Sequence, residues 1–121
     1  MSEYIINNID SKRYIEAIPP TFIIENEQDA LDIAAVCGEN ETSLLLLYYE
    51  NLAPGFFDLR TGLAGAILQK FVMYRIRVAA VIPSENIKGR FREMVVESNR
   101  GSHFRVFERK DYAIKWLINE K

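Results

Sequence analysis

The chain has little of what most catalytic and metal-binding sites are built from. Its 121 residues include one cysteine, Cys37, and one histidine, His103. One side chain of each kind cannot supply the set of nitrogen and sulfur ligands that a zinc site needs, and a nucleophile–histidine–acid triad has a single possible base. We therefore predict no catalytic residue, no metal site and no cofactor, and we expect His103 to be a partly exposed strand residue.

Nucleotide-binding signatures are also missing. The sequence has neither GxxxxGK[ST] nor GxGxxG, the glycine-rich patterns that bring backbone N–H groups against phosphates, and it has no CxxC pair. A phosphate loop, a dinucleotide site and a zinc ribbon are therefore excluded. A hydrolytic or transfer enzyme ranks third among the function classes considered, and we expect that the protein is not an enzyme.

Long apolar runs are absent as well. No window approaches the roughly 18 apolar residues of a membrane helix, and the start MSEYIINNID lacks the basic and apolar regions of a signal peptide. The lone Cys37 cannot form an internal disulfide and falls on the apolar side of a helical pattern, so we expect it to be buried. These features predict a cytoplasmic protein that does not bind a membrane.

The formal net charge of -2 conceals a division between the halves of the chain. Residues 1–60 hold three basic residues against eleven acidic ones, whereas residues 61–121 hold twelve against six. A duplex-DNA binder would favour a clearly basic chain, so we predict no nucleic-acid partner. We expect the halves to neutralise each other across the fold or in a second copy. The alternative is a basic face, from Lys88, Arg92, Arg100 and Arg105, that attracts an anionic partner.

Hydrophobic periodicity alternates between the periods of strands and of helices. The pattern predicts strands at 3–9, 13–18, 44–49, 75–82 and 103–107, and helices at 26–38, 59–74, 87–98 and 110–120. The order ββαβαβαβα predicts one α/β domain over residues 1–121, with right-handed crossovers, a mostly parallel or mixed sheet and an N-terminal β-hairpin at one side. The unbroken apolar run at 44–49 is typical of a central strand.

Helix ends are marked by capping residues. Asn26 and Asp58 are the expected N-caps of the first two helices, and Gly38 and Gly101 are the expected stops of the first and third. Glycine inside a helix costs about 1 kcal/mol relative to alanine, so Gly62 and Gly65 in the second helix need a reason. Close packing of the helix on the sheet is the first explanation, and approach of a ligand or another backbone is the second.

Polar residues gather where the central strand gives way to the second helix. The carboxyl ends of parallel strands are a common place for ligands, and free N–H groups at a helix start can hold an anion. The expected ligand-binding or partner-binding residues are Glu50, Asn51, Phe56, Asp58, Arg60, Thr61, Gly62, Ser84 and Asn86. We expect Thr61 to lie about one turn inside the helix, open to solvent, where added phosphate is tolerated. The alternative is that Asp58 is only a cap, Phe57 a core plug and Arg60 a solvent residue.

Three separated motifs carry a family resemblance. The chain resembles the bacterial family called domain of unknown function 4180 in three runs, which occur in this order: NLAPGFFDLRTGLAGAILQKF, YRIRVAAV and ESNRG. The element order and the D-x-x-T-G-L of Asp58 to Leu63 also resemble the STAS domains of anti-sigma-factor antagonists. In those domains D-S-x-G-L presents a phosphorylatable serine at this helix start. The resemblance implies that Asp58 corresponds to the acid and Thr61 to the acceptor, although Leu59 follows the acid here and one extra residue precedes Gly62.

The sequence thus favours a non-enzymatic regulatory or protein-interaction module. Its working surface is expected at residues 50–63, together with the loop at 83–86. The alternative is a binder of a small anionic ligand at the N-terminus of the second helix. An unknown protein is the expected partner, and a homodimer is considered.

Overall fold

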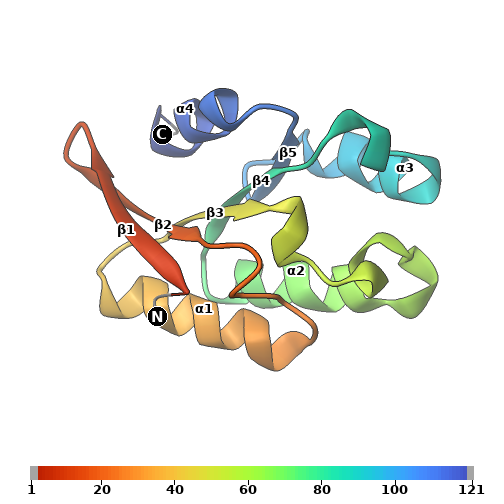
Figure 1. Cartoon of the computed structure of the whole chain (residues 1–121), viewed down its shortest axis with the longest axis horizontal. Helices are drawn as coiled ribbons and strands as arrows, with labels where there is room; N and C mark the ends of the chain where they lie inside the picture. Colours follow the sequence, from red (N-terminus) through yellow and green to blue (C-terminus); the bar gives the residue numbers. More distant parts are fainter. Residues whose placement is uncertain (1–2, 120–121) are drawn as a thin grey trace.

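The computed structural model describes residues 3–119, which form a mixed five-stranded sheet and four helices (Figure 1). The strands lie in chain order, and they are β1 (Tyr4–Ile9), β2 (Lys12–Ala17), β3 (Leu44–Tyr48), β4 (Arg77–Val81) and β5 (Phe104–Phe107). The helices are α1 (Glu27–Glu39), α2 (Leu63–Met73), α3 (Gly89–Ser98) and α4 (Lys110–Asn119). Strands β1 and β2 pair antiparallel and the other neighbours pair parallel. The predicted α/β class, with its N-terminal hairpin, is confirmed.

The hairpin turns through Asp10 and Ser11, which both have positive φ angles, 52° and 66°. Two-residue turns of this kind match the right-handed twist of the strands that they join. Ile9 pairs with Lys12 directly across the turn. The tip of the hairpin therefore has a fixed register although it contains no glycine.

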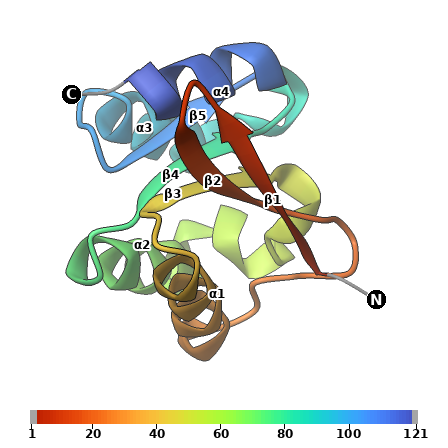
Figure 2. The same cartoon turned by 90° about the vertical axis from the view of Figure 1, so that its left-hand side faces the viewer.

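The sheet separates two hydrophobic cores. Buried residues of α1, α2 and α3 share one core with one face of the sheet, while α4 covers the other face (Figure 2). In the central strand, Leu45 and Leu47 belong to the first core and Leu46 belongs to the second. This double burial explains the unbroken apolar run of β3. Cys37 is fully buried in the first core, as predicted.

Several predicted boundaries are wrong by a few residues. Helix α1 begins after its expected cap Asn26 but runs through Gly38 to Glu39, and Asn40 caps its end. Gly101 is not in the left-handed region, because Asn99 caps α3 and the chain continues as a turn. His103 lies just before β5 and is exposed.

Candidate functional site

The strand-to-helix junction after β3 consists of three short 3-10 turns, η1 (Tyr49–Asn51), η2 (Pro54–Phe57) and η3 (Leu59–Thr61). Helix α2 therefore begins at Leu63 and not at Leu59 as predicted. The reason is local: Asp58 Oδ1 accepts a hydrogen bond from Arg60 N, and Gly62 then adopts the left-handed conformation with φ 74°. A residue in that conformation interrupts a right-handed helix, so the Asp58 cap serves η3 alone.

Thr61 is exposed, but its hydroxyl is already occupied. Thr61 Oγ1 lies 2.8 Å from both Gly55 O and Asp58 O, to which it donates, and it accepts a hydrogen bond from Leu63 N at 3.1 Å. The residue thus lies just before Gly62, the N-cap of α2, and its hydroxyl accepts from the first N–H of the helix, instead of lying one turn inside it. A phosphate on this oxygen would face two carbonyl oxygens, so added negative charge is expected to disturb the turn, contrary to the expectation from the sequence.

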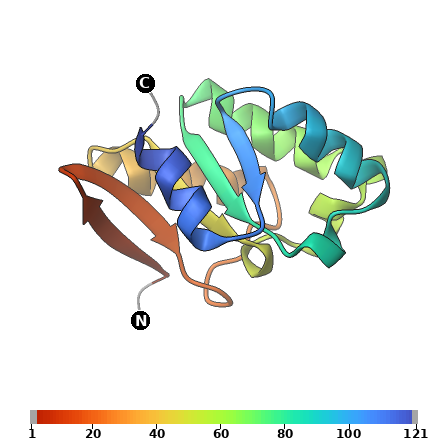
Figure 3. The same ribbon diagram turned by 90° about the horizontal axis from the view of Figure 1, so that it is seen from above.

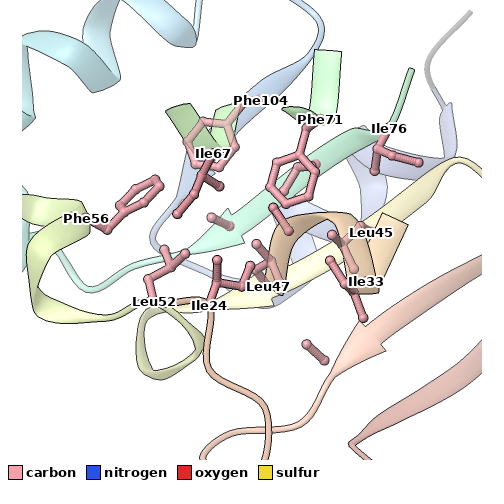
Figure 4. Close-up of a cluster of buried hydrophobic side chains, with 14 of the residues drawn as sticks. Ile24, Ile33, Leu45, Leu47, Leu52, Phe56, Ile67, Phe71, Ile76 and Phe104 are labelled. Atoms are coloured by element: carbon pink, nitrogen blue, oxygen red, sulfur yellow. The ribbon is translucent and has the colours of Figure 1, made fainter. Parts of the chain in front are cut away.

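Two of the predicted site residues lie in the interior. Phe56 is fully buried in the core that Figure 4 shows, beside Phe104. Asn51 is also fully buried, with Oδ1 accepting from Tyr48 N at 2.7 Å and Nδ2 donating to Phe22 O at 2.8 Å. Neither side chain can touch a partner in this conformation. The sequence does not reveal this burial because the segment folds into 3-10 turns, whose geometry sets the direction of each side chain.

A groove of about 450 Å³ lies between the junction and the beginning of α3. We call it the junction groove, and it is lined by Phe57, Asp58, Leu59, Arg60, Lys88, Gly89, Arg90 and Phe91. Of the predicted site residues only Asp58 and Arg60 line it. Besides the buried Asn51 and Phe56, five are outside the lining: Glu50, Thr61, Gly62 and Ser84, which are exposed, and Asn86, which is half-buried in the turn η4 (Ser84–Asn86). The structure brings Asp58 and Arg60 together with Lys88 and Arg90, a juxtaposition that the sequence prediction missed.

The base of the junction groove is aromatic. The ring of Phe57 lies 4.9 Å from those of Tyr49 and Phe91, measured between centroids, and 5.5 Å from that of Phe56. Tilted and edge-to-face contacts of this kind stabilise a cluster beyond its buried area. They hold η2 against α3, so the two walls of the groove are joined by packing.

The rim of the junction groove is basic. Arg60 binds the carboxylate of Asp58 through two hydrogen bonds of 3.0 Å, and this contact lowers the pKa of Asp58. Lys88 and Arg90 are exposed and form no ion pair within residues 3–119. Asp58 is the sole carboxylate of the lining, and its charge is balanced by Arg60. The groove thus carries an excess of positive charge.

The acidic and basic halves of the chain meet at two places in the part of the chain that the structure describes. Glu27 binds Lys70 at 3.5 Å, and Glu16 binds Lys110 at 3.3 Å. The remaining ion pairs, Asp58–Arg60, Glu97–Arg100 and Asp111–Arg109, are local in sequence. The basic residues at the start of α3 are therefore left for solvent or a partner.

A second polar cluster, around Glu16 of β2, was missed by sequence reasoning. Its carboxylate accepts from Tyr48 Oη at 2.5 Å and from Asn7 Nδ2 at 2.9 Å, besides binding Lys110. Burial alone would raise the pKa of Glu16, but these bonds outweigh it and leave the pKa below its ordinary value. Burial and the neighbouring carboxylate raise the pKa of Tyr48. The cluster ties β1, β2, β3 and α4 together, and no sequence spacing could reveal it because it depends on strand register.

Gly62 and Gly65 do not lie against another backbone in the described structure. A Cβ placed on Gly65 would meet no atom within 4 Å in the described structure, and the same holds for Gly62. Gly65 faces solvent, so close packing was the wrong explanation for it. Gly62 is explained by its positive φ angle.

Within residues 3–119, no group of three or more histidine, cysteine, aspartate or glutamate side chains is arranged to hold a metal ion. None of the helices in that range has the length and apolar character needed to cross a membrane.

Comparison with known proteins places the chain in a family. The family model described as Domain of unknown function (DUF4180) matches residues 9–117, which include the last residue of β1, strands β2 to β5 and all of the junction groove. The chain belongs to this family. Neither the curated proteins nor the solved structures contain a match to it.

Proposed function

We propose that this DUF4180 domain is a non-enzymatic protein-interaction module whose working surface is the junction groove. The observation that carries the proposal is the combination of an aromatic base, formed around Phe57, with the cations Lys88 and Arg90 on the rim, which form no ion pair with any described residue. Protein interfaces typically have an apolar centre within a polar rim, and complementary charge steers the partner and fixes its orientation. The partner that fits is an acidic segment of another protein that carries an apolar or aromatic anchor.

A finer assignment is part of the same proposal. We propose that the domain acts in regulation in a bacterial cytoplasm and is related to the STAS domains. The support is the resemblance of the D-L-R-T-G-L run, Asp58 to Leu63, and the place of its first three residues, Asp58 to Arg60, in the lining of the groove. The hydrogen bonds of Thr61 argue for a structural role of its hydroxyl, so regulation would act through partner binding at the groove.

Binding of a small anion at the beginning of α2 has less support. Thr61 Oγ1 already satisfies Leu63 N, and Arg60 is held by Asp58, so the groups that would receive the anion are engaged within the chain. The carboxylate of Asp58 would also repel an anion placed there.

The test is capture of partners from the native host with three forms of the protein. The double variant Lys88→Glu/Arg90→Glu reverses the rim charge, while Lys115→Glu, at an exposed position of α4, introduces a negative charge elsewhere. We expect the wild type and Lys115→Glu to retain the same partner, and the double variant to lose it while remaining folded. The wild-type complex should also weaken as salt rises. Equal capture by the double variant would refute the proposal.

A further inference from the structure

Among the described residues, no strand pairs with the outer edge of β1. Strand β1 is the outermost strand at the end of the sheet opposite to β5 (Figure 3). In its antiparallel register with β2, alternate pairs share hydrogen bonds, beginning with Ile9 and Lys12 at the tight turn. The same alternation turns the N–H and C=O groups of Tyr4, Ile6 and Asn8 outward, away from β2. These residues offer a row of backbone donors and acceptors to another strand.

The opposite edge of the sheet is closed by a side chain. Asn99 Nδ2 donates to Val106 O at 3.1 Å, and Asn99 Oδ1 accepts from Val106 N at 2.8 Å, so the amide occupies both outward groups of this β5 residue. Strand β5 is also short, with four residues, and it carries the charged Arg105. Short length, charge and blocked backbone groups are the features that prevent edge-to-edge pairing.

Strand β1 has none of these protections. From Tyr4 to Ile9 it contains no charge, no proline and no glycine. Ile5 and Ile6, on opposite faces of the strand, are 46% and 45% exposed. The β2–β3 register is centred on Ile15 and Glu16, so the hairpin tip projects past β3 as a two-stranded ribbon. Such a ribbon is marginally stable alone and gains from further strands.

We propose that a second copy of this chain binds here, with the two β1 strands antiparallel about a two-fold axis between their Ile6 residues. This register pairs Ile6 with Ile6 and Tyr4 with Asn8 of the second copy, so every outward residue of both strands is hydrogen-bonded. Registers shifted along the strand leave some of these groups unpaired. A surface that matches itself in this way is what an isologous dimer requires, and the uncharged strand brings no like charges together.

The register can be tested with cysteine pairs, because Cys37 is buried and leaves no reactive background. The proposed pairing sets Ile5 opposite Asn7 of the second copy, in a non-hydrogen-bonded position with Cα atoms about 4.5 Å apart, within reach of a disulfide. The two Ile5 residues of the dimer, and likewise the two Asn7 residues, are diagonal neighbours with Cα atoms about 8 Å apart. This distance is too long for a disulfide. Under mild oxidation, a mixture of Ile5→Cys and Asn7→Cys proteins should form a covalent heterodimer. Each variant alone is the matched control and should stay uncrosslinked.

Charge complementation at the axis gives an independent test, measured by sedimentation equilibrium. We expect a wild-type dimer at high micromolar concentration. Ile6→Lys and Ile6→Glu, which alter an exposed side chain, should each be folded monomers, and their equal mixture should restore the dimer. Met73→Lys, at another exposed apolar residue, should leave the dimer intact. A monomeric wild type would overturn the proposal and favour an extended segment of another protein at this edge. Dimers of either Ile6 variant alone, or no heterodimer in the mixture, would also overturn it.

Discussion

Asn51 links the junction to the segment that precedes α1 through both its side chain and its backbone. Besides its bonds to Tyr48 and Phe22, its backbone oxygen accepts from Ile24 N at 2.7 Å, and Ile24 forms an isolated bridge with Leu52. A buried amide with both ends satisfied fixes one arrangement of the surrounding loops. Asn51, which is fully buried, thus fixes the turn η1 at the start of the junction against the segment at 22–24.

We therefore predict that Asn51→Ala destabilises the protein strongly. The substitution leaves Tyr48 N and Phe22 O buried without their partner, and each such group costs about 1 to 3 kcal/mol. The expected loss is roughly 3 kcal/mol, measured by urea unfolding. Asn86→Ala, which removes a half-buried amide with no hydrogen bond in residues 3–119, is the control and should change the stability by less than about 0.5 kcal/mol. Equal effects of the two substitutions would contradict the role given to Asn51.

The two glycines near the beginning of α2 should respond in opposite directions to alanine. Gly65 lies inside the helix with open space at its Cβ position, so Gly65→Ala should stabilise the protein by about 0.5 to 1 kcal/mol. Gly62 has φ 74°, so Gly62→Ala should destabilise it by about 1 kcal/mol. Both changes in stability can be measured by thermal unfolding. A destabilised Gly65→Ala would show that the surface around this residue is occupied.

Single residues of the site were only partly predictable. The sequence indicated the junction and the exposure of Arg60 and Thr61, because polar residues next to glycine mark a turn. It could not indicate which of Phe56 and Phe57 points inward, since that depends on the local geometry of η2. It named Lys88 only as part of a basic face and did not name Arg90, since both residues reach the groove only through the crossover from β4 to α3.

Helix α4 is the element on which the second core depends. Trp116 is half-buried, and the Arg77 guanidinium lies 3.6 Å from the centre of its ring, with Arg77 Nη2 donating to Trp116 O. Phe107 of β5 lies against the same ring at 5.7 Å between centroids. The tryptophan thus joins α4 to the last two strands by apolar and cation–π contacts.

Removing this ring should loosen α4. Complete aromatic truncations in a core cost about 3 to 5 kcal/mol, and since Trp116 is half-buried we predict about 2 to 3 kcal/mol for Trp116→Ala. Amide protons of α4 should exchange faster than those of α1 in the variant, as measured by hydrogen exchange. Tyr112→Ala, at a 55% exposed position of the same helix, should have little effect. If Trp116→Ala keeps the wild-type stability, the helix is peripheral to the fold.

Elements were predicted more reliably than their ends. Strong periodicity identified every strand and helix, because burial on one or two faces imposes it. The start of α2 was misplaced since Asp58 is a good cap, and the sequence alone does not distinguish a 3-10 turn from the first turn of an α-helix.

At the scale of the whole molecule, Glu16 links the hairpin, the central strand and α4. Its folded pKa is lowered, so the unfolded chain binds a proton more readily, and the stabilisation is present at neutral pH and is lost as the pH falls through the folded pKa. We predict that Glu16→Gln lowers the stability at pH 7 by about 1 to 3 kcal/mol, the range of hydrogen bonds to charged groups.

Measuring the stability of both proteins as a function of pH provides the control for this prediction. Melting temperatures of the wild type should fall steeply between neutral and acidic pH, and the difference from Glu16→Gln should shrink at the acidic end. Glu108→Gln, at an exposed position, should follow the wild-type curve. A difference that stays constant down to acid would mean that Glu16 contributes by packing and not by charge.

The architecture as a whole was accessible from the sequence because alternating periods admit few topologies once right-handed crossovers are required. The charge division of the chain was also visible, but its spatial outcome was not. Within residues 3–119, two ion pairs join the halves, whereas Lys88 and Arg90 at the start of α3 form none. The fold decides which charged side chains lie without a neighbour of opposite charge. We place the binding surface at two such side chains, Lys88 and Arg90.

Site-specific photo-crosslinking in the native host tests that placement most directly. A photoreactive p-benzoylphenylalanine in place of Arg90 would sit on the rim of the junction groove, and the same group in place of Lys115 would sit on α4. We predict that the Arg90 position captures one other protein, that the Lys115 position does not, and that the adduct is lost when Lys88→Glu is added. Identical adducts from both positions, or adducts at Arg90 that contain only a second copy of this chain, would contradict the account.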